Sequence, residues 1–258
     1  MPEPLALIGR RLPRGWPDLL LQFALFFLAY QGYQVVRGLI DGKDELAFAN
    51  AERIVDIERS LGTFFEPGLQ QALLGHAWLI DIANWLYVNS HFTITVVFLA
   101  WLYLFRNENF YFVRNMFMVA MGIALVGYAL FPTAPPRMLP GEGFTDTIAA
   151  FTSVDQDSNA VSLLVNKYAA VPSMHIGFSS MIAGTAVMLV RNPIGRALWA
   201  LYPLLVFAVI VVTANHYWLD AAAGLLVAAC AAVIASRVLA PVRPAQWAFR
   251  PVAEKAPA

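Results

Sequence analysis

The sequence predicts an all-α integral membrane protein, a bundle of six transmembrane helices with an amphipathic helix between the first two. Hydrophobic residues make up 59% of the 258-residue chain and charged residues only 13%, whereas soluble domains carry roughly 25% charged residues. The mean hydropathy is +0.61. Apolar runs of about 20 residues, the length that crosses a bilayer as a helix, also recur along the chain.

Charge and cysteine content argue against several other classes of protein. The chain carries 17 basic and 17 acidic residues, so its net charge is zero and gives no reason to expect a nucleic-acid partner. Its single cysteine, Cys230, lies inside an apolar run and indicates neither a disulfide framework nor a metal cluster. No Gly-rich phosphate loop is present. We therefore expect no cofactor and no bound metal.

The first apolar run follows three arginines, as a signal peptide would. It continues through Val36 without a convincing cleavage site, so we interpret it as a retained first span. The six predicted spans are residues 17–40, 80–105, 113–131, 174–190, 197–213 and 219–239.

Residues 41–75, between the first two spans, predict a helix on the membrane surface. Acids and bases alternate there around an apolar stripe at helical spacing. We expect the helix to end near Gly62 and again at Pro67–Gly68, and most of its charges to belong to a polar helix that only connects spans. The stripe consists of Ala47, Ala51, Ile54, Ile57 and Leu61.

The remaining segments predict loop and tail. Residues 132–171 are rich in prolines, glycines and small polar residues, which indicates a loop. Residues 1–240 are expected to form a single membrane-embedded domain, and the Pro-rich residues 241–258 a disordered cytoplasmic tail.

Basic residues predict the orientation in the membrane. With a cytoplasmic N-terminus, 11 of the 17 basic residues fall on the cytoplasmic side, as the positive-inside rule requires. We therefore predict a multi-pass protein of the plasma (inner) membrane with both termini cytoplasmic. Three polar clusters then share the extracytoplasmic face: residues 131–137, 172–175 and 215–220.

These clusters hold residues suited to phosphate chemistry. His216 and Asp220 are four apart, so on a helix they share one face, and the carboxylate leaves one imidazole nitrogen free as base or nucleophile. Arg137 can bind phosphate oxygens with two parallel hydrogen bonds. Ser173 adds a hydroxyl at a helix start, and His175 can protonate a leaving group. On spacing alone, a capped helix end at the lipid interface explains His216 and Asp220 equally well.

The motifs themselves resemble a known family. Pro-Ser-Met-His at 172–175 and His-x-x-x-Asp at 216–220 resemble motifs of the type 2 phosphatidic acid phosphatase superfamily. Phe-Pro-x-x-Pro-Pro-Arg at 131–137 and Asn-His-Tyr-x-x-Asp at 215–220 resemble the branch of inositol phosphorylceramide synthases and their bacterial relatives. The resemblance covers about residues 45–240.

The resemblance implies a mechanism without metal. His216 would be the nucleophile that forms a phosphohistidine, and Asp220 would orient it. His175 would protonate the leaving oxygen and then activate the acceptor. Arg137 and Ser173 would hold the phosphoryl oxygens. The substrate would be a phospholipid, a sphingolipid-like lipid or a polyprenyl phosphate, and the protein would be surrounded by membrane lipids.

Two basic residues of the phosphatase pattern are missing. Leu130 stands seven residues before Arg137, where a lysine is usual, and Ile210 stands six before His216 in place of an arginine. The synthase-like branch also lacks that arginine. Lys167 is a candidate replacement, and a solvated loop lysine is the other interpretation. His91, within a span, is interpreted either as a pocket residue or as a buried hydrogen-bonded side chain.

Three functions stay open on the sequence. The motif branch favours a transferase that passes a phosphorylated group to another lipid. A hydrolase of lipid phosphates or polyprenyl diphosphates shares the first step. A non-enzymatic lipid binder or transporter is the third.

Overall fold

The computed structural model describes residues 12–40, 42–152 and 167–250. Every regular element there is helical, apart from an isolated bridge between Thr133 and Ala169. The helices longer than four residues are α2 (Gly15–Ile40), α3 (Asp44–Ser60), α4 (Glu66–Leu74), α5 (Ala77–Trp85), η1 (Leu86–Ser90), α6 (His91–Phe105), α7 (Asn107–Leu130), α8 (Thr147–Thr152), α10 (Met174–Leu189), α11 (Pro193–Val212), α12 (Trp218–Ile234) and η4 (Ala235–Leu239).

Five helical stretches in the described residues are long and apolar enough to cross a membrane. They are Gly15–Val36, Ala77–Phe105, Asn107–Leu130, Pro193–Val212 and Trp218–Val242. The sixth predicted span is α10, which is apolar but has only 16 residues. The all-α prediction is thus confirmed, while the sixth span stays a prediction.

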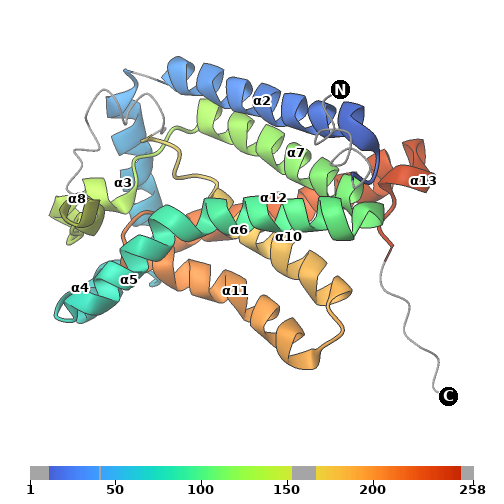
Figure 1. The fold of residues 1–258 in the computed structure, drawn as a ribbon. Helices are drawn as coiled ribbons and strands as arrows, with labels where there is room; N and C mark the ends of the chain where they lie inside the picture. The colour runs from blue at the N-terminus through green and yellow to red at the C-terminus, as the bar shows by residue number, and fades with distance from the viewer. Residues whose placement is uncertain (1–11, 41, 153–166, 251–258) are drawn as a thin grey trace.

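The long helices form a bundle with two distinct ends (Figure 1). Helices α7, α10 and α12 pack against one another in its centre, and α6 packs on α7 and α10. Helix α2 packs along α7, and α11 packs along α10. Helices α3, α4 and α8 gather at one end, called here the α3 end, and the short α13 (Pro244–Trp247) lies at the other.

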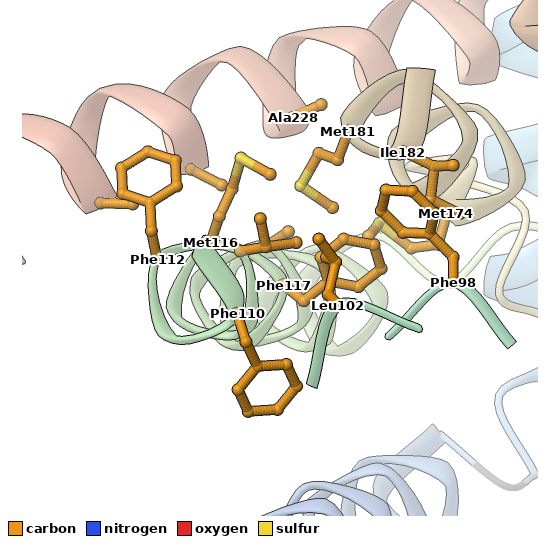
Figure 2. Packing of buried hydrophobic residues seen from close by; sticks show 14 of the residues in the cluster. Phe98, Leu102, Phe110, Phe112, Met116, Phe117, Met174, Met181, Ile182 and Ala228 are labelled. Atoms are coloured by element: carbon orange, nitrogen blue, oxygen red, sulfur yellow. The ribbon is translucent and has the colours of Figure 1, made fainter. Parts of the chain in front are cut away.

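Aromatic and methionine side chains fill the centre of the bundle. Figure 2 shows Met116 and Phe117 of α7 facing Met181 and Ile182 of α10, with Ala228 of α12 close by. All of these side chains are buried. Because lipid tails are as apolar as these residues, helix association here depends on close packing more than on water exclusion.

Helices α10 and α12 make backbone contact at Gly224. A Cβ at this position would lie 2.1 Å from the carbonyl oxygen of Ser173, where no side chain fits. The amide of Ser173 also donates to the carbonyl of Asp220 at 3.0 Å. This close approach joins the first turns of the two helices.

The second span contains a π-helical turn. Helix α5 continues through η1 into α6, and η1 is wound as a π-helix. Such turns occur often at functional sites, because the extra residue re-aims the side chains that follow. Here the turn carries Tyr87, whose ring stacks on His175 with centroids 4.7 Å apart.

Residues 44–60 form a helix, α3, as predicted, while its place on the membrane surface stays a prediction; its buried face differs from the predicted stripe. Ala47, Ala51 and Ile54 are buried as expected, whereas Ile57 is 49% and Leu61 59% exposed. Ile57 lies at the edge of the face, and Leu61 lies beyond the end of α3. Glu58, one of the charged residues of this helix, is completely buried near its C-terminal end.

Two further sequence expectations differ from the structure. Pro67–Gly68 does not end a helix: Pro67 lies in the first turn of α4, where its missing N–H has no helical partner to lose. Residues 241–250 are not structureless, because the amide of Arg250 donates to Asn109 on α7 at 2.7 Å and Phe249 packs on Phe112. Residues 251–258 of the predicted tail lie outside the described part of the chain.

Candidate active site

The three polar clusters converge at the α3 end of the bundle. His175 lies in the first turn of α10, and its Nδ1 is 3.2 Å from Nε2 of His216. Arg137, in the short helix Pro136–Met138, donates from Nη1 to Oδ1 of Asn215 at 3.1 Å. Its backbone amide donates to the carbonyl of Ala214 at 2.7 Å. The structure therefore brings the two histidines and Arg137 to one place.

His216 is held as a neutral ring whose Nε2 carries no proton. Its Nδ1 lies 3.0 Å from the carbonyl oxygen of Ala170 and 3.3 Å from Oδ2 of Asp220, so Nδ1 carries the proton. Burial lowers the pKa of His216 to about 3, the Ala170 carbonyl opposes this shift, and the charge of Arg137 adds to it. At neutral pH, Nε2 therefore keeps its lone pair and can attack.

The His216–Asp220 contact arises differently from the sequence prediction. The two residues do not share a helical face, because α12 begins only at Trp218. Instead, the Asp220 side chain turns back over the start of the helix, where Oδ2 accepts the backbone amide of Tyr217 at 3.0 Å. Capping the helix thus places the same carboxylate oxygen beside His216.

The turn before His216 has an unusual backbone. Ala214 adopts φ of 51°, in the left-handed region that residues with a Cβ rarely occupy. Such conformations persist where surrounding contacts over-determine them. Here the carbonyl of Ala214 accepts Arg137 N–H, and the amides of Asn215 and His216 both donate to the carbonyl of Ile210.

His175 lies in a stack of rings. The ring centroid of His91 is 4.4 Å from that of His175, on which Tyr87 also stacks. Nδ1 of His91 is buried and has no hydrogen-bond partner. Of the two interpretations of His91, a buried hydrogen-bonded side chain does not describe this nitrogen. The structure instead places His91 beside a candidate catalytic residue.

Ser173 supplies a buried hydroxyl at the start of α10. Its side chain is completely buried, and its Oγ has no hydrogen-bond partner. The first-turn amides of α10 lie next to it, and amides at this position of a helix favour anions. Such an unsatisfied buried hydroxyl calls for a ligand or a water as its partner.

Three further positions were singled out because two basic residues of the phosphatase pattern are missing: Lys167, Leu130 and Ile210. The ammonium group of Lys167 lies 5.0 Å from the ring centroid of Tyr168, so a role for Lys167 in phosphate binding stays a prediction. Leu130 is 77% exposed, whereas Ile210 is buried. The apolar residue at 210 therefore fills space within the protein, where an arginine would be costly without a paired anion.

Three residues that position the site were not predicted. Asn215 is buried and joins Arg137 to Oγ1 of Thr213, to which it donates at 2.9 Å. Asp146 places Oδ2 3.5 Å from Nε of Arg137. Ala170 orients His216 through its backbone carbonyl. Asn215 belongs to the predicted cluster 215–220, although its role was not predicted; a loop carboxylate and a carbonyl leave no signal in one sequence.

No metal site is evident in residues 12–40, 42–152 and 167–250. No group of three or more His, Cys, Asp or Glu side chains there could hold a metal ion. Metal independence of the reaction stays a prediction.

Comparison with known proteins identifies the family. A family model described as PAP2 superfamily matches residues 52–234, more than two thirds of the chain. The match includes all three polar clusters of the candidate site. The chain belongs to the PAP2 superfamily. This confirms the superfamily predicted from the motifs, although not the synthase-like branch. Neither curated proteins nor solved structures give a match.

Membership and helix composition together define the protein at a coarse level. It is a membrane protein of the PAP2 superfamily and a phosphatase-type lipid enzyme. Its substrate class is a lipid phosphate.

Proposed function

We propose that this PAP2 protein transfers a phosphoryl group from a phosphorylated lipid to a hydroxyl acceptor through a phosphohistidine at His216. The observation that carries the proposal is the neutral His216 ring. Its Nδ1 is held by Ala170 and Asp220, and its Nε2 faces a second histidine. A buried imidazole oriented in this way is suited to nucleophilic catalysis.

In the first step, Nε2 of His216 attacks phosphorus. A P–N bond forms while the P–O bond to the lipid alcohol breaks. An anionic phosphoryl group favours the imidazolium form of His175, which gives its proton to the leaving oxygen. Arg137, the Ser173 hydroxyl and the first-turn amides of α10 hold the remaining phosphoryl oxygens. Asp220 and the Ala170 carbonyl stabilise the positive charge that develops on the His216 ring.

In the second step, the acceptor restores the enzyme. Neutral His175 takes the proton of the acceptor hydroxyl, whose oxygen attacks phosphorus as the P–N bond breaks. Water as acceptor makes the reaction hydrolysis, and an alcohol makes it transfer. We favour a lipid alcohol, on the motif resemblance to inositol phosphorylceramide synthases and their bacterial relatives.

Two cavities support a lipid substrate. One of about 90 Å³ is bordered by His175, by η1 and α6, and by α11 as far as Tyr202. A second, of about 430 Å³, is lined almost entirely by apolar side chains of α6, α10 and α11. Ile94 lines both cavities. An acyl or polyprenyl chain can therefore extend from His175 between α6 and α11, within the depth of the membrane.

The membrane orientation is part of the proposal. The basic residues of the loops favour a plasma-membrane protein with cytoplasmic termini. The α3 end, with the active site, then faces the extracytoplasmic side. A topology map with labelled single-cysteine variants tests this, and accessibility of the α3 end from the cytoplasm would contradict it.

The decisive experiment is a lipid-substrate panel on the purified full-length protein in detergent. Phosphatidic acid, a polyprenyl diphosphate and phosphatidylinositol are each supplied with and without a ceramide or diacylglycerol acceptor. Phosphate release and labelled lipid products are measured. His216→Ala is expected to lose more than about 1000-fold of the activity, and wild type to trap acid-labile phosphate. His76→Ala, an exposed histidine at the start of α5, is the matched control.

The outcomes separate the three functions. Product formation that depends on the acceptor supports transfer, whereas phosphate release without an acceptor supports a hydrolase. A non-enzymatic function would be supported if wild type and His216→Ala both lack activity and both still bind or move lipid. That last result would overturn the proposal.

A further inference from the structure

Three carboxyl groups cap the start of α12, immediately after His216. Asp220 accepts the amide of Tyr217. Glu66 Oε1 accepts the amide of Trp218 at 2.9 Å, and Glu58 Oε1 accepts the amide of Leu219 at 3.2 Å. Glu58 and Glu66 come from α3 and α4, more than 150 residues away in the sequence. Helices α3 and α4 therefore hold the first turn of α12, the helix that follows His216.

Neither glutamate has access to solvent. Both side chains are completely buried, and the second oxygen, Oε2, of each has no hydrogen-bond partner. The two groups accept the amides of neighbouring residues, Trp218 and Leu219, so they lie close together, and water does not screen the repulsion of two buried carboxylates so placed. A single proton between them relieves the repulsion and gives each Oε2 a partner. This is how paired acids in protein interiors behave.

We propose that Glu58 and Glu66 share one proton and, as a pair, position His216 by capping the first turn of α12. The proposal rests on the role of His216 as nucleophile. The shared charge of −1 suits the positive end of the helix dipole. A fully ionised pair would push α3 and α4 apart and release the amides of Trp218 and Leu219. Asp220 Oδ2, which contacts both Tyr217 N–H and His216 Nδ1, would then lose its place.

The surroundings of Glu58 agree with a retained proton. Burial raises the pKa of Glu58 to about 9, and the neighbouring Glu66 and Asp220 contribute, while the Leu219 amide opposes the shift. The titratable side chains that face the pair from α12 and the residue before it are Asp220 and Tyr217. Burial and these carboxylates also raise the pKa of Tyr217, so its hydroxyl stays neutral.

The test compares Glu58→Gln with Glu58→Ala in the full-length protein. Glutamine keeps the acceptor for Leu219 and supplies an N–H to Glu66 in place of the shared proton, whereas alanine removes both. At pH 7, we expect kcat to fall by less than about threefold for Glu58→Gln and by about tenfold or more for Glu58→Ala. Wild-type kcat is expected to fall as the pH rises above about 9. In Glu58→Gln, this fall is expected to begin about one pH unit or more higher.

Infrared spectroscopy provides a readout that does not depend on activity. A protonated carboxyl group has a carbonyl stretch separate from that of carboxylates. Wild type at pH 7 is expected to show this band, and both Glu58→Gln and Glu66→Gln are expected to lose it. Glu52→Gln, on the exposed side of α3, is the matched control and should keep the band.

The outcomes distinguish this inference from the proposed function. The proposal of a shared proton is wrong if the band persists in both glutamine variants. It is also wrong if kcat falls at the same alkaline pH in wild type and Glu58→Gln. Equal losses of kcat in Glu58→Gln and Glu58→Ala would also overturn it. A wild type that has the band but forms no phosphohistidine would instead contradict the role of His216, and the positioning role with it.

Discussion

The centre of the bundle and its α3 end are held together by different interactions. The centre is packed with apolar side chains such as Met116, Phe117 and Met181. The α3 end is held by five fully or almost fully buried polar residues, called here the polar network: Asn50, Glu58, Glu66, Gln70 and Asn84.

Every member of the polar network bonds to the backbone of a distant segment. Asn50 donates to the carbonyl of Pro132 at 2.8 Å, and Asn84 donates to that of Thr147 at 3.0 Å. Gln70 donates to the carbonyl of Val212 and accepts the amide of Thr145. Apolar packing tolerates exchange among side chains of similar volume. Hydrogen bonds to backbone require one donor or acceptor at one place, so the network is suited to holding the loops that carry the candidate catalytic residues.

The largest effect is expected where the two regions meet. Gly224→Ala would place a Cβ on the carbonyl of Ser173, and the backbones of α10 and α12 would have to separate. We expect a loss of more than about 3 kcal/mol of stability and of most activity. Thermal unfolding in detergent and kcat measure this. Gly184→Ala, where a Cβ meets nothing within 4 Å, is the control. Equal behaviour of the two variants would contradict the close contact.

Within the network, Gln70→Ala is expected to cost about 2–3 kcal/mol, because it leaves the buried carbonyl of Val212 without this donor and breaks two part-buried bonds to the backbone of Thr145. The matched control is Gln71→Ala, whose side chain makes an exposed bond to the carbonyl of Gly143. Thermal unfolding and kcat are measured for both. Similar losses in the two variants would show that the buried bonds of Gln70 are not what holds the α3 end.

The pH dependence sharpens the comparison further. The pKa of His216 is lowered to about 3 in the folded protein, so between pH 6.5 and 3 the unfolded chain binds a proton that the folded protein does not. Stability from this group is present above pH 6.5 and is lost as the pH falls. Relative to His216→Gln, wild type is expected to lose about 1 kcal/mol between pH 6 and pH 5. Glu58, whose raised pKa acts in the opposite direction, contributes equally to both proteins and cancels. Parallel melting temperatures of the two proteins across this range would contradict a buried neutral His216.

The smallest effect is expected in the centre of the bundle. Met181→Leu conserves volume and breaks no hydrogen bond, so a cost below about 1.5 kcal/mol and a kcat within twofold of wild type are expected. Thermal unfolding and steady-state kinetics check this. A large loss of kcat would mean that the centre of the bundle also positions the site.

The sequence predicted which side chains could carry chemistry, but it said little about the contacts that hold those side chains in place. His175, His216, Asp220, Arg137 and Ser173 could be named because rare polar residues stand out in apolar surroundings. The helical character of the spans followed from their length and composition.

Other features depend on tertiary contacts that one sequence does not display. Glu58 looked like one charge among several on a surface helix, because its burial depends on α12 covering it. The contact between His216 and Asp220 was predicted for the wrong reason, since the start of α12 depends on capping as well as on apolar periodicity.

The direct contact between His175 and His216 has a consequence for turnover. A phosphoryl group between the two rings needs roughly 3 Å to each nitrogen, so the rings must separate whenever the site is filled. When inorganic phosphate or a product lipid departs, the 3.2 Å bond between the rings forms again. If the site binds phosphate as proposed, this bond stabilises the empty state and lowers the affinity of substrate and product alike.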